Sequence, residues 1–289
     1  MNLFIKKSLF FIIFLISFIV ILYNSVNIVL NSTSQNNSVF IWGDSQTYFG
    51  IDLDIINNEK QIALTSAQTG SGVYDFLVFS EKIPNNSTVL IGISKPFFLR
   101  DKKRDRNDAG LSFNSIKIMK EYGYSIDELM VIIKGNLVPK KLFSTNTKLY
   151  NVSDSLIITN KKLDKFRGIF HQNIDFVKNK ERLFLKGIDI LKKKNCKMFL
   201  IEFPLHEYLY NLESDTEYGS IFRNFKIELI HQLNIKNIDT IKLDSSKRLM
   251  HDLTHLNELG AKEVSNCILK LLNSNKNAKL IVINGGAAK

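Results

Sequence analysis

Cysteine is scarce in this chain of 289 residues, which holds only Cys196 and Cys267. Neither cysteine stands at a spacing typical of a metal site, and no nucleotide-binding motif is present. The sequence therefore predicts no metal centre and no cofactor. We interpret both cysteines as buried thiols, with a disulfide between them as the alternative.

Charge is absent from a long stretch near the N-terminus. No charged residue occurs between Lys7 and Asp44, and residues 8–30 are mostly apolar. A bilayer core of about 30 Å needs roughly 20 apolar residues, so this run is long enough to span a membrane. The Ala-x-Ala pattern of a signal-peptide cleavage site is also absent. We interpret residues 1–30 as a short cytoplasmic tip followed by an uncleaved signal anchor, with a cleaved signal peptide as the alternative.

The positive charges around the apolar run indicate its orientation. Lys6 and Lys7 precede the run, and no positive charge follows closely behind it. The positive-inside rule then places the N-terminus in the cytoplasm and the rest of the chain outside it. We predict a single-pass protein of the cell membrane, with residues 31–38 as a polar tether to an extracytoplasmic domain.

Positive charge exceeds negative charge over the whole chain. Lysine and arginine total 39 against 28 aspartate and glutamate residues, so the formal net charge is +11. A basic surface favours anionic partners such as lipid headgroups or acidic polysaccharide. Because no basic motif with interleaved aromatic residues is present, we expect no nucleic-acid partner.

After the tether, patterns typical of strands and helices alternate, which predicts a parallel sheet with crossover helices. The strands are wholly apolar in places, as in Val89–Ile93, and such strands suit a sheet that is covered on both faces. The predicted strands are 39–43, 61–65, 87–94, 196–203 and 237–243, and the predicted helices are 72–82, 172–194, 216–234 and 257–274.

Two regions depart from this alternation. Residues 100–170 hold a charged loop and the pattern of two short helices, which we interpret as an insertion on top of the sheet, near the C-terminal strand ends. Residues 275–289 end in glycine and alanine, and we interpret them as a C-terminal tail. The folded domain is therefore expected to span residues 39–274.

Gly43, Asp44 and Ser45 follow the first predicted strand directly. All three residue types form turns, so a simple turn is one interpretation. The other is a serine nucleophile at a strand end, which needs a base and an acid that orients the base. Asp252 and His255 stand three residues apart just before a helix, a spacing that lets the carboxylate reach the imidazole. The alternative for this pair is a helix N-terminus with a solvated histidine.

The segments GDSQT (43–47) and DLTHLNELG (252–260) resemble the first and last sequence blocks of the SGNH hydrolases, the GDSL esterase superfamily. This resemblance implies a three-layer α/β/α sandwich around a central parallel sheet, flavodoxin-like, here preceded by one transmembrane helix. It also implies that Ser45 is the nucleophile, His255 the base and Asp252 the residue that orients it. We then expect Ser45 Oγ to lie within hydrogen-bond reach of His255 Nε2, and Asp252 to contact His255 Nδ1.

The resemblance also implies an oxyanion hole. Its donors would be the backbone N–H of Ser45, the glycine Gly70 after the second strand, with Gly72 as the alternative, and a side chain after the third strand. The family has asparagine at that last position, whereas this chain has Ser94. In this departure the chain resembles the exported acyltransfer branch, which includes the D-alanyl transfer protein of teichoic acids and relatives of the alginate O-acetylation proteins.

Four further residues are candidates for lining a substrate pocket: Asp44, Gln46 and Gly72, which lie beside these motifs, and His206, which follows the fourth predicted strand. A place in a surface loop is the alternative for His206, and both glycines after the second strand have the alternative of only beginning a helix. Trp42, directly before Gly43, is predicted to lie in the core.

The family resemblance implies a membrane-anchored, extracytoplasmic serine acyl-ester hydrolase or O-acyltransferase that acts on cell-surface polysaccharide through Ser45, His255 and Asp252. An acyltransferase in the membrane is the expected partner protein. Two alternatives remain: a lipid-directed esterase or lysophospholipase, and a non-catalytic surface assembly protein that keeps the fold.

Overall fold

A parallel β-sheet organises the chain. The computed structural model describes residues 2–31, 38–57, 62–67, 72–93, 112–138, 141–145, 147–151, 164, 174–206, 209, 216–235, 238–243, 249–273 and 280–284. Within these ranges the sheet has six strands in the order β2-β1-β3-β4-β6-β5, and every neighbouring pair is parallel. The strands are β1 (Ser38–Trp42), β2 (Ile62–Thr65), β3 (Thr88–Ile93), β4 (Lys197–Glu202), β5 (Ile238–Lys242) and β6 (Leu280–Asn284).

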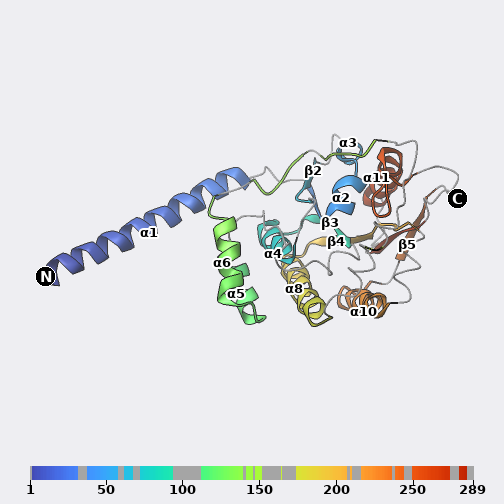
Figure 1. Cartoon of the computed structure of the whole chain (residues 1–289). Coiled ribbons are helices and arrows are strands. Elements are labelled where there is room, and N and C mark those ends of the chain that lie inside the picture. Colours follow the sequence, from blue (N-terminus) through green and yellow to red (C-terminus); the bar gives the residue numbers. More distant parts are fainter. Residues whose placement is uncertain are drawn as a thin grey trace.

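Helices connect the strands and cover the sheet (Figure 1). The described helices are α1 (Asn2–Asn31), α2 (Ser45–Gly50), α3 (Leu53–Ile56), α4 (Val73–Lys82), α5 (Phe113–Glu121), α6 (Ile126–Gly135), α8 (Ile174–Lys193), α10 (Glu217–Gln232) and α11 (Glu258–Asn273). The predicted α/β class with a parallel sheet is confirmed, and all five predicted strands are present. The four predicted helices are also present, as α4, α8, α10 and α11.

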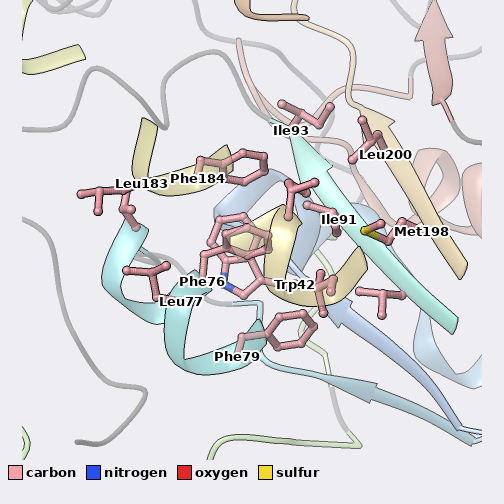
Figure 2. Close-up of a cluster of buried hydrophobic side chains, with 14 of the residues drawn as sticks. Trp42, Phe76, Leu77, Phe79, Ile91, Ile93, Leu183, Phe184, Met198 and Leu200 are labelled. Carbon is pink, nitrogen blue, oxygen red and sulfur yellow. The ribbon is translucent and has the colours of Figure 1, made fainter. Parts of the chain in front are cut away.

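The larger hydrophobic core lies between one face of the sheet and helices α4, α8 and α10. Trp42 of β1 is fully buried there, with its ring centroid 4.5 Å from that of Phe76 on α4 and 5.9 Å from that of Phe184 on α8. Figure 2 shows these three side chains with Ile91 and Leu200 from the neighbouring strands. The predicted core position of Trp42 is therefore confirmed.

A second core occupies the opposite face of the sheet. Successive side chains of a strand point to opposite faces of the sheet. Val39 and Ile41 of β1 therefore lie in the second core, on the face opposite Trp42. They pack there with residues of α3 and α11, among them Val264 and Ile268. Burial on both faces explains why the central strands are apolar at nearly every position.

The interpretation of residues 275–289 as a tail is wrong for the segment that forms β6. Leu280–Asn284 lies inside the sheet, hydrogen-bonded to β4 on one side and β5 on the other. Leu280, Ile281 and Ile283 are buried. The β-branched run 281–283 is a strand signal that the following glycines obscured, and the folded domain extends at least to Asn284.

The described part of the insertion of residues 100–170 agrees only partly with the expected place on top of the sheet. Its two short helices, α5 and α6, are present, but they pack beside α4 and extend the helical layer instead of covering the strand ends (Figure 1). Among the described residues of the insertion, 141–145 and 147–151 reach the strand ends. Ser144 pairs there with Thr65, the last residue of β2, through two backbone hydrogen bonds of 2.8 Å.

The first helix, α1, projects away from the sheet (Figure 1). Its segment Phe4–Val26 has a mean hydropathy of 2.6 and is not buried by the rest of the chain. It is long and apolar enough to cross a membrane, a property that a signal sequence shares. The tether predicted at 31–38 lies almost wholly outside the described residues.

Helix α2 sits unusually close to the ends of β1 and β3. A Cβ atom added to Gly43, after β1, or to Gly92, in β3, would overlap the side chain of Thr47. Thr47 is 1% exposed, so it has no room to move aside. Two glycines are therefore needed for this helix to pack against the strands.

We expect Gly92→Ala to destabilise the protein by about 1–3 kcal/mol, because the added methyl group overpacks the contact with Thr47. The measurement is thermal unfolding of the full chain in detergent. Gly135→Ala is the matched control, because a Cβ atom there meets nothing within 4 Å. Equal melting temperatures for the two variants would contradict the proposed close contact.

Candidate active site

Ser45 lies at the point where the direction of strand connection reverses. The chain leaves β1 for β2 on one side, and the next strand, β3, pairs on the other side of β1. In open parallel sheets, ligands bind at the C-terminal strand ends beside such a reversal. Ser45 is the first residue of α2, directly after this end of β1. The preceding residue, Asp44, caps the helix by accepting a hydrogen bond of 2.9 Å from Gln46 N.

A closed loop, residues 249–257, presents Asp252 and His255. Met250 and Leu256 form an antiparallel bridge, and Asn257 N donates to Leu249 O at 2.9 Å. Within the loop that this bridge closes, His251 N donates to His255 O at 2.8 Å. Asn257 then begins α11, since its Oδ1 accepts a hydrogen bond from Gly260 N at 3.1 Å, as an N-cap does.

Three side chains form a continuous hydrogen-bonded chain. Asp252 Oδ2 lies 2.9 Å from His255 Nδ1, and His255 Nε2 lies 3.0 Å from Ser45 Oγ. Both distances are ordinary hydrogen-bond lengths. The expected contacts among Ser45, His255 and Asp252 are thus confirmed, although 210 positions separate the serine from the histidine.

The Asp252 carboxylate is held in its ionised form. Burial by itself would raise the pKa of Asp252, but hydrogen bonds and charge interaction with His255, together with the backbone N–H groups of Thr254 and His255, hold it well below its usual range. Because the carboxylate accepts from Nδ1, it favours the imidazole tautomer whose Nε2 lone pair faces Ser45 Oγ.

Gln46 and Asp44, predicted as pocket residues, are instead buried supports of the site. Gln46 is 3% exposed, and its Nε2 donates to Thr254 O at 2.8 Å, which joins α2 to the loop that carries Asp252 and His255. Asp44 is 2% exposed and caps α2. Both residues hold the loop and Ser45 in place and do not offer a surface to a ligand.

His206 and Gly72 also have structural roles. His206 is buried, which rules out the surface-loop interpretation, and its N donates to Leu253 O at 3.0 Å, so the segment that follows β4 supports the same loop. Gly72 is the N-cap of α4, and its N–H donates to Asp75 Oδ2 at 2.9 Å. Its N–H is therefore engaged, and Gly72 begins a helix, as the alternative interpretation had it. The other two oxyanion candidates, Gly70 and Ser94, lie outside the described residues.

Aromatic side chains that the sequence analysis did not predict pack around His255. Phe49 is 5.5 Å from the His255 ring, centroid to centroid, in an edge-to-face arrangement, and Tyr150 is also 5.5 Å from it. Tyr150 stacks on Phe49 at 4.0 Å and on His251, nearly parallel, at 4.0 Å. Burial and then the Asp252 charge raise the pKa of Tyr150, so it stays neutral.

Phe49 could have been found from the sequence, because it follows Ser45 by four residues and so shares its helix face. Tyr150 belongs to no motif and lies in the insertion. Its backbone O accepts a hydrogen bond from Glu258 N at 2.7 Å, which ties the insertion to the start of α11. The ring of His251, next to Asp252 in the sequence, stacks on Tyr150.

Cys196 and Cys267 are both free thiols and both half-buried, so the disulfide alternative is wrong. Burial raises the pKa of each thiol. Among the residues that the structure describes, no group of three or more His, Cys, Asp or Glu side chains is placed to hold a metal ion.

No protein-family model matches the chain, and no curated protein matches it in sequence. Family membership is therefore a proposal that depends on the motifs and on the geometry of Ser45, His255 and Asp252.

The lowered pKa of Asp252 predicts a pH-dependent contribution to stability. A carboxyl group whose pKa falls on folding stabilises the fold above its unfolded value of about 3.9, and this contribution is lost as the pH drops through the lower folded value. We expect Asp252→Asn to melt below the wild type at pH 7, and the two melting temperatures to converge as the pH is lowered below 4. A gap that stays constant with pH would contradict a depressed pKa.

Proposed function

We propose that the protein is a serine acyl-ester hydrolase or O-acyltransferase of the SGNH type. The observation that carries this proposal is the chain of contacts from Asp252 through His255 to Ser45. These contacts lie at the end of β1, where the order of strand connection reverses. A protein that only kept the fold would have no need for this alignment of acid, imidazole and hydroxyl. The alignment thus favours an enzyme over a non-catalytic assembly protein.

In the proposed reaction, Ser45 Oγ attacks the carbonyl carbon of an ester while its proton passes to His255 Nε2. The protonated imidazole is stabilised by Asp252 at Nδ1 and then gives its proton to the departing alcohol oxygen. This leaves an acyl group on Ser45. A water molecule or a sugar hydroxyl, deprotonated by His255, attacks the acyl carbon, and Ser45 Oγ leaves with the proton that His255 returns to it.

The developing negative oxygen requires donors close to Ser45. We assign this role to the backbone N–H of Ser45, to Gly70 and to Ser94, which stands where the family has asparagine. Loss of one such donor typically lowers the rate by about 10²–10³. Ser94 in place of asparagine is therefore consistent with a slow hydrolase or with transfer to a preferred acceptor.

The substrate class that we propose is an O-acylated cell-surface polysaccharide. This proposal is supported by the resemblance of the chain to the exported acyltransfer branch and by the presence of a helix, α1, that is able to span a membrane. The six-stranded parallel sheet with a core on each face is consistent with the three-layer sandwich of that family. An acyltransferase in the membrane would supply or receive the acyl group.

We propose that α1 is an uncleaved anchor and that the folded domain lies outside the cytoplasm. Lys6 and Lys7 lie near the N-terminal end of α1. The end of a membrane helix that carries more lysine and arginine usually faces the cytoplasm, so the N-terminus is placed there.

Substitution of the three aligned residues tests the chemistry. We expect Ser45→Ala to abolish formation of an acyl-enzyme and His255→Ala to do almost the same, because the hydroxyl then has no base. Asp252→Asn should leave the fold intact and lower turnover by about 10⁴, because the imidazole tautomer is no longer held. The measurements are p-nitrophenyl acetate turnover and the mass of the protein after reaction with the ester.

Ser220→Ala is the matched control for Ser45→Ala, because Ser220 is exposed on α10. It should retain wild-type turnover. The proposal fails if Ser45→Ala still forms the acyl-enzyme, or if cells that carry this variant keep normal O-acylation of their surface glycan.

The position of the domain is tested by a reporter fused after Lys289. We expect a reporter enzyme that folds only outside the cytoplasm to be active when it is fused at this position. Activity of a cytoplasm-specific reporter at the same position would contradict the proposed orientation of α1.

A further inference from the structure

Exposed apolar side chains are concentrated on one part of the folded domain. Outside α1, the described residues include nine large apolar side chains that are exposed, and six of them lie between residues 113 and 138. The six are Phe113, Ile126, Met130, Val131, Leu137 and Val138. The other three, Ile227, Ile238 and Leu259, are scattered over three different elements. Single exposed apolar residues are ordinary, whereas a cluster marks a surface that contacts something apolar.

This cluster, which we call the α5–α6 face, adjoins the end of α1. The hydroxyl of Tyr23 donates to Asn136 O, at the C-cap of α6, with a distance of 3.0 Å. Tyr23 lies in the last turn of the apolar segment Phe4–Val26, at the depth where tyrosine side chains meet the membrane–water interface. Leu137 and Val138 directly follow Asn136, so they lie at about the same depth.

Helix α5 packs against α6, and its start is held on α4. Ser112 N, which precedes the exposed Phe113, donates to the hydroxyl of Tyr74 on α4 at 3.0 Å. Figure 1 shows that α5 and α6 are on the side of the domain from which α1 projects, and that α6 runs across the direction of α1. A helix that runs across a membrane span lies along the plane of the membrane.

We propose that the α5–α6 face rests in the interface of the lipid bilayer that α1 spans, with its apolar side chains in the headgroup–acyl boundary. This proposal depends on the membrane anchor proposed above. Helices of this kind bury their apolar side about 5–10 Å into the interface. The occupant is lipid because α1 itself brings the bilayer to this side of the domain.

The charges of the segment indicate that apolar contact, and not attraction to anionic lipid, holds it there. Residues 112–138 contain three lysines and three acidic residues, so their charges cancel. The lysine Lys134 stands among the exposed apolar side chains of α6, where its long stem can lie along the interface with its ammonium group in water. A neutral lipid is therefore a sufficient partner.

Two attachments would restrict the domain more than one. A single helix with a flexible connection lets a domain rotate and tilt above the membrane. A second contact through the α5–α6 face fixes the side of the sheet that faces the bilayer, and with it the direction from which a membrane-bound donor or acceptor reaches Ser45.

The test uses tryptophan fluorescence of the full chain in phosphatidylcholine vesicles, with and without bromine atoms on the lipid chains. The native tryptophan, Trp42, is fully buried and gives a constant background. Leu137→Trp probes the α5–α6 face, and Val131→Trp gives an independent reading on α6. Ile227→Trp is the matched control, since Ile227 is 51% exposed on α10. Phe14→Trp reports on the span itself.

We expect brominated lipid to quench the added fluorescence of Leu137→Trp, Val131→Trp and Phe14→Trp, and to leave that of Ile227→Trp unchanged. Quenching of Phe14→Trp without quenching at the two face positions would overturn the lipid contact while the anchor stands. Absence of quenching at Phe14→Trp would overturn the anchor and the lipid contact together. The added emission at positions 131 and 137 could instead depend on the protein-to-lipid ratio and not on bromine. That result would show that a second copy of the protein covers the α5–α6 face, and it would overturn the proposal.

Discussion

The carboxylate of Asp252 is the constraint on which the rest of the site depends. Its Oδ1 alone lies within hydrogen-bond distance of four groups: Thr254 N at 2.7 Å, Thr254 Oγ1 at 3.2 Å, His255 N at 2.9 Å and His255 Nδ1 at 3.0 Å. Two of these partners are backbone groups of the loop, and one is the imidazole ring of His255. One carboxylate oxygen thus contacts both the backbone of the loop and the imidazole ring, and it restrains the path of the chain and the orientation of the ring together.

The loop that Asp252 organises is also connected to three other parts of the fold. Gln46 joins it to α2, the backbone of His206 joins it to the end of β4, and Asn257 joins it to α11. Ser45 is held from the opposite side by the close packing of Thr47 against Gly43 and Gly92. The distance between Ser45 and His255 is therefore set by buried contacts on both sides of the site.

Much of this arrangement could be predicted from short-range patterns. Apolar runs identify the central strands, and the i, i+3 spacing of Asp252 and His255 is enough to predict their contact. The sequence did not show whether the residues beside these motifs face a ligand or support the loop, because Gln46 and His206 are polar in either case and only their burial decides. Tyr150 could not be predicted, since its place beside His255 results from the path of a long insertion and from one backbone hydrogen bond to Glu258. The position of β6 between β4 and β5 is likewise a property of the whole sheet.

That position of β6 imposes an order on assembly. In the described sheet, β5 has no neighbour except β6, and the free side of β4 is filled only by β6. During synthesis of the chain, β4 and β5 emerge before the strand that joins them, so both present unpaired backbone edges to their surroundings. Unpaired edges readily bind other chains, and contacts between distant segments form slowly. Leu280–Asn284 therefore completes this part of the sheet only after β4 and β5 have been synthesised, and until then their edges are open to pairing with other chains.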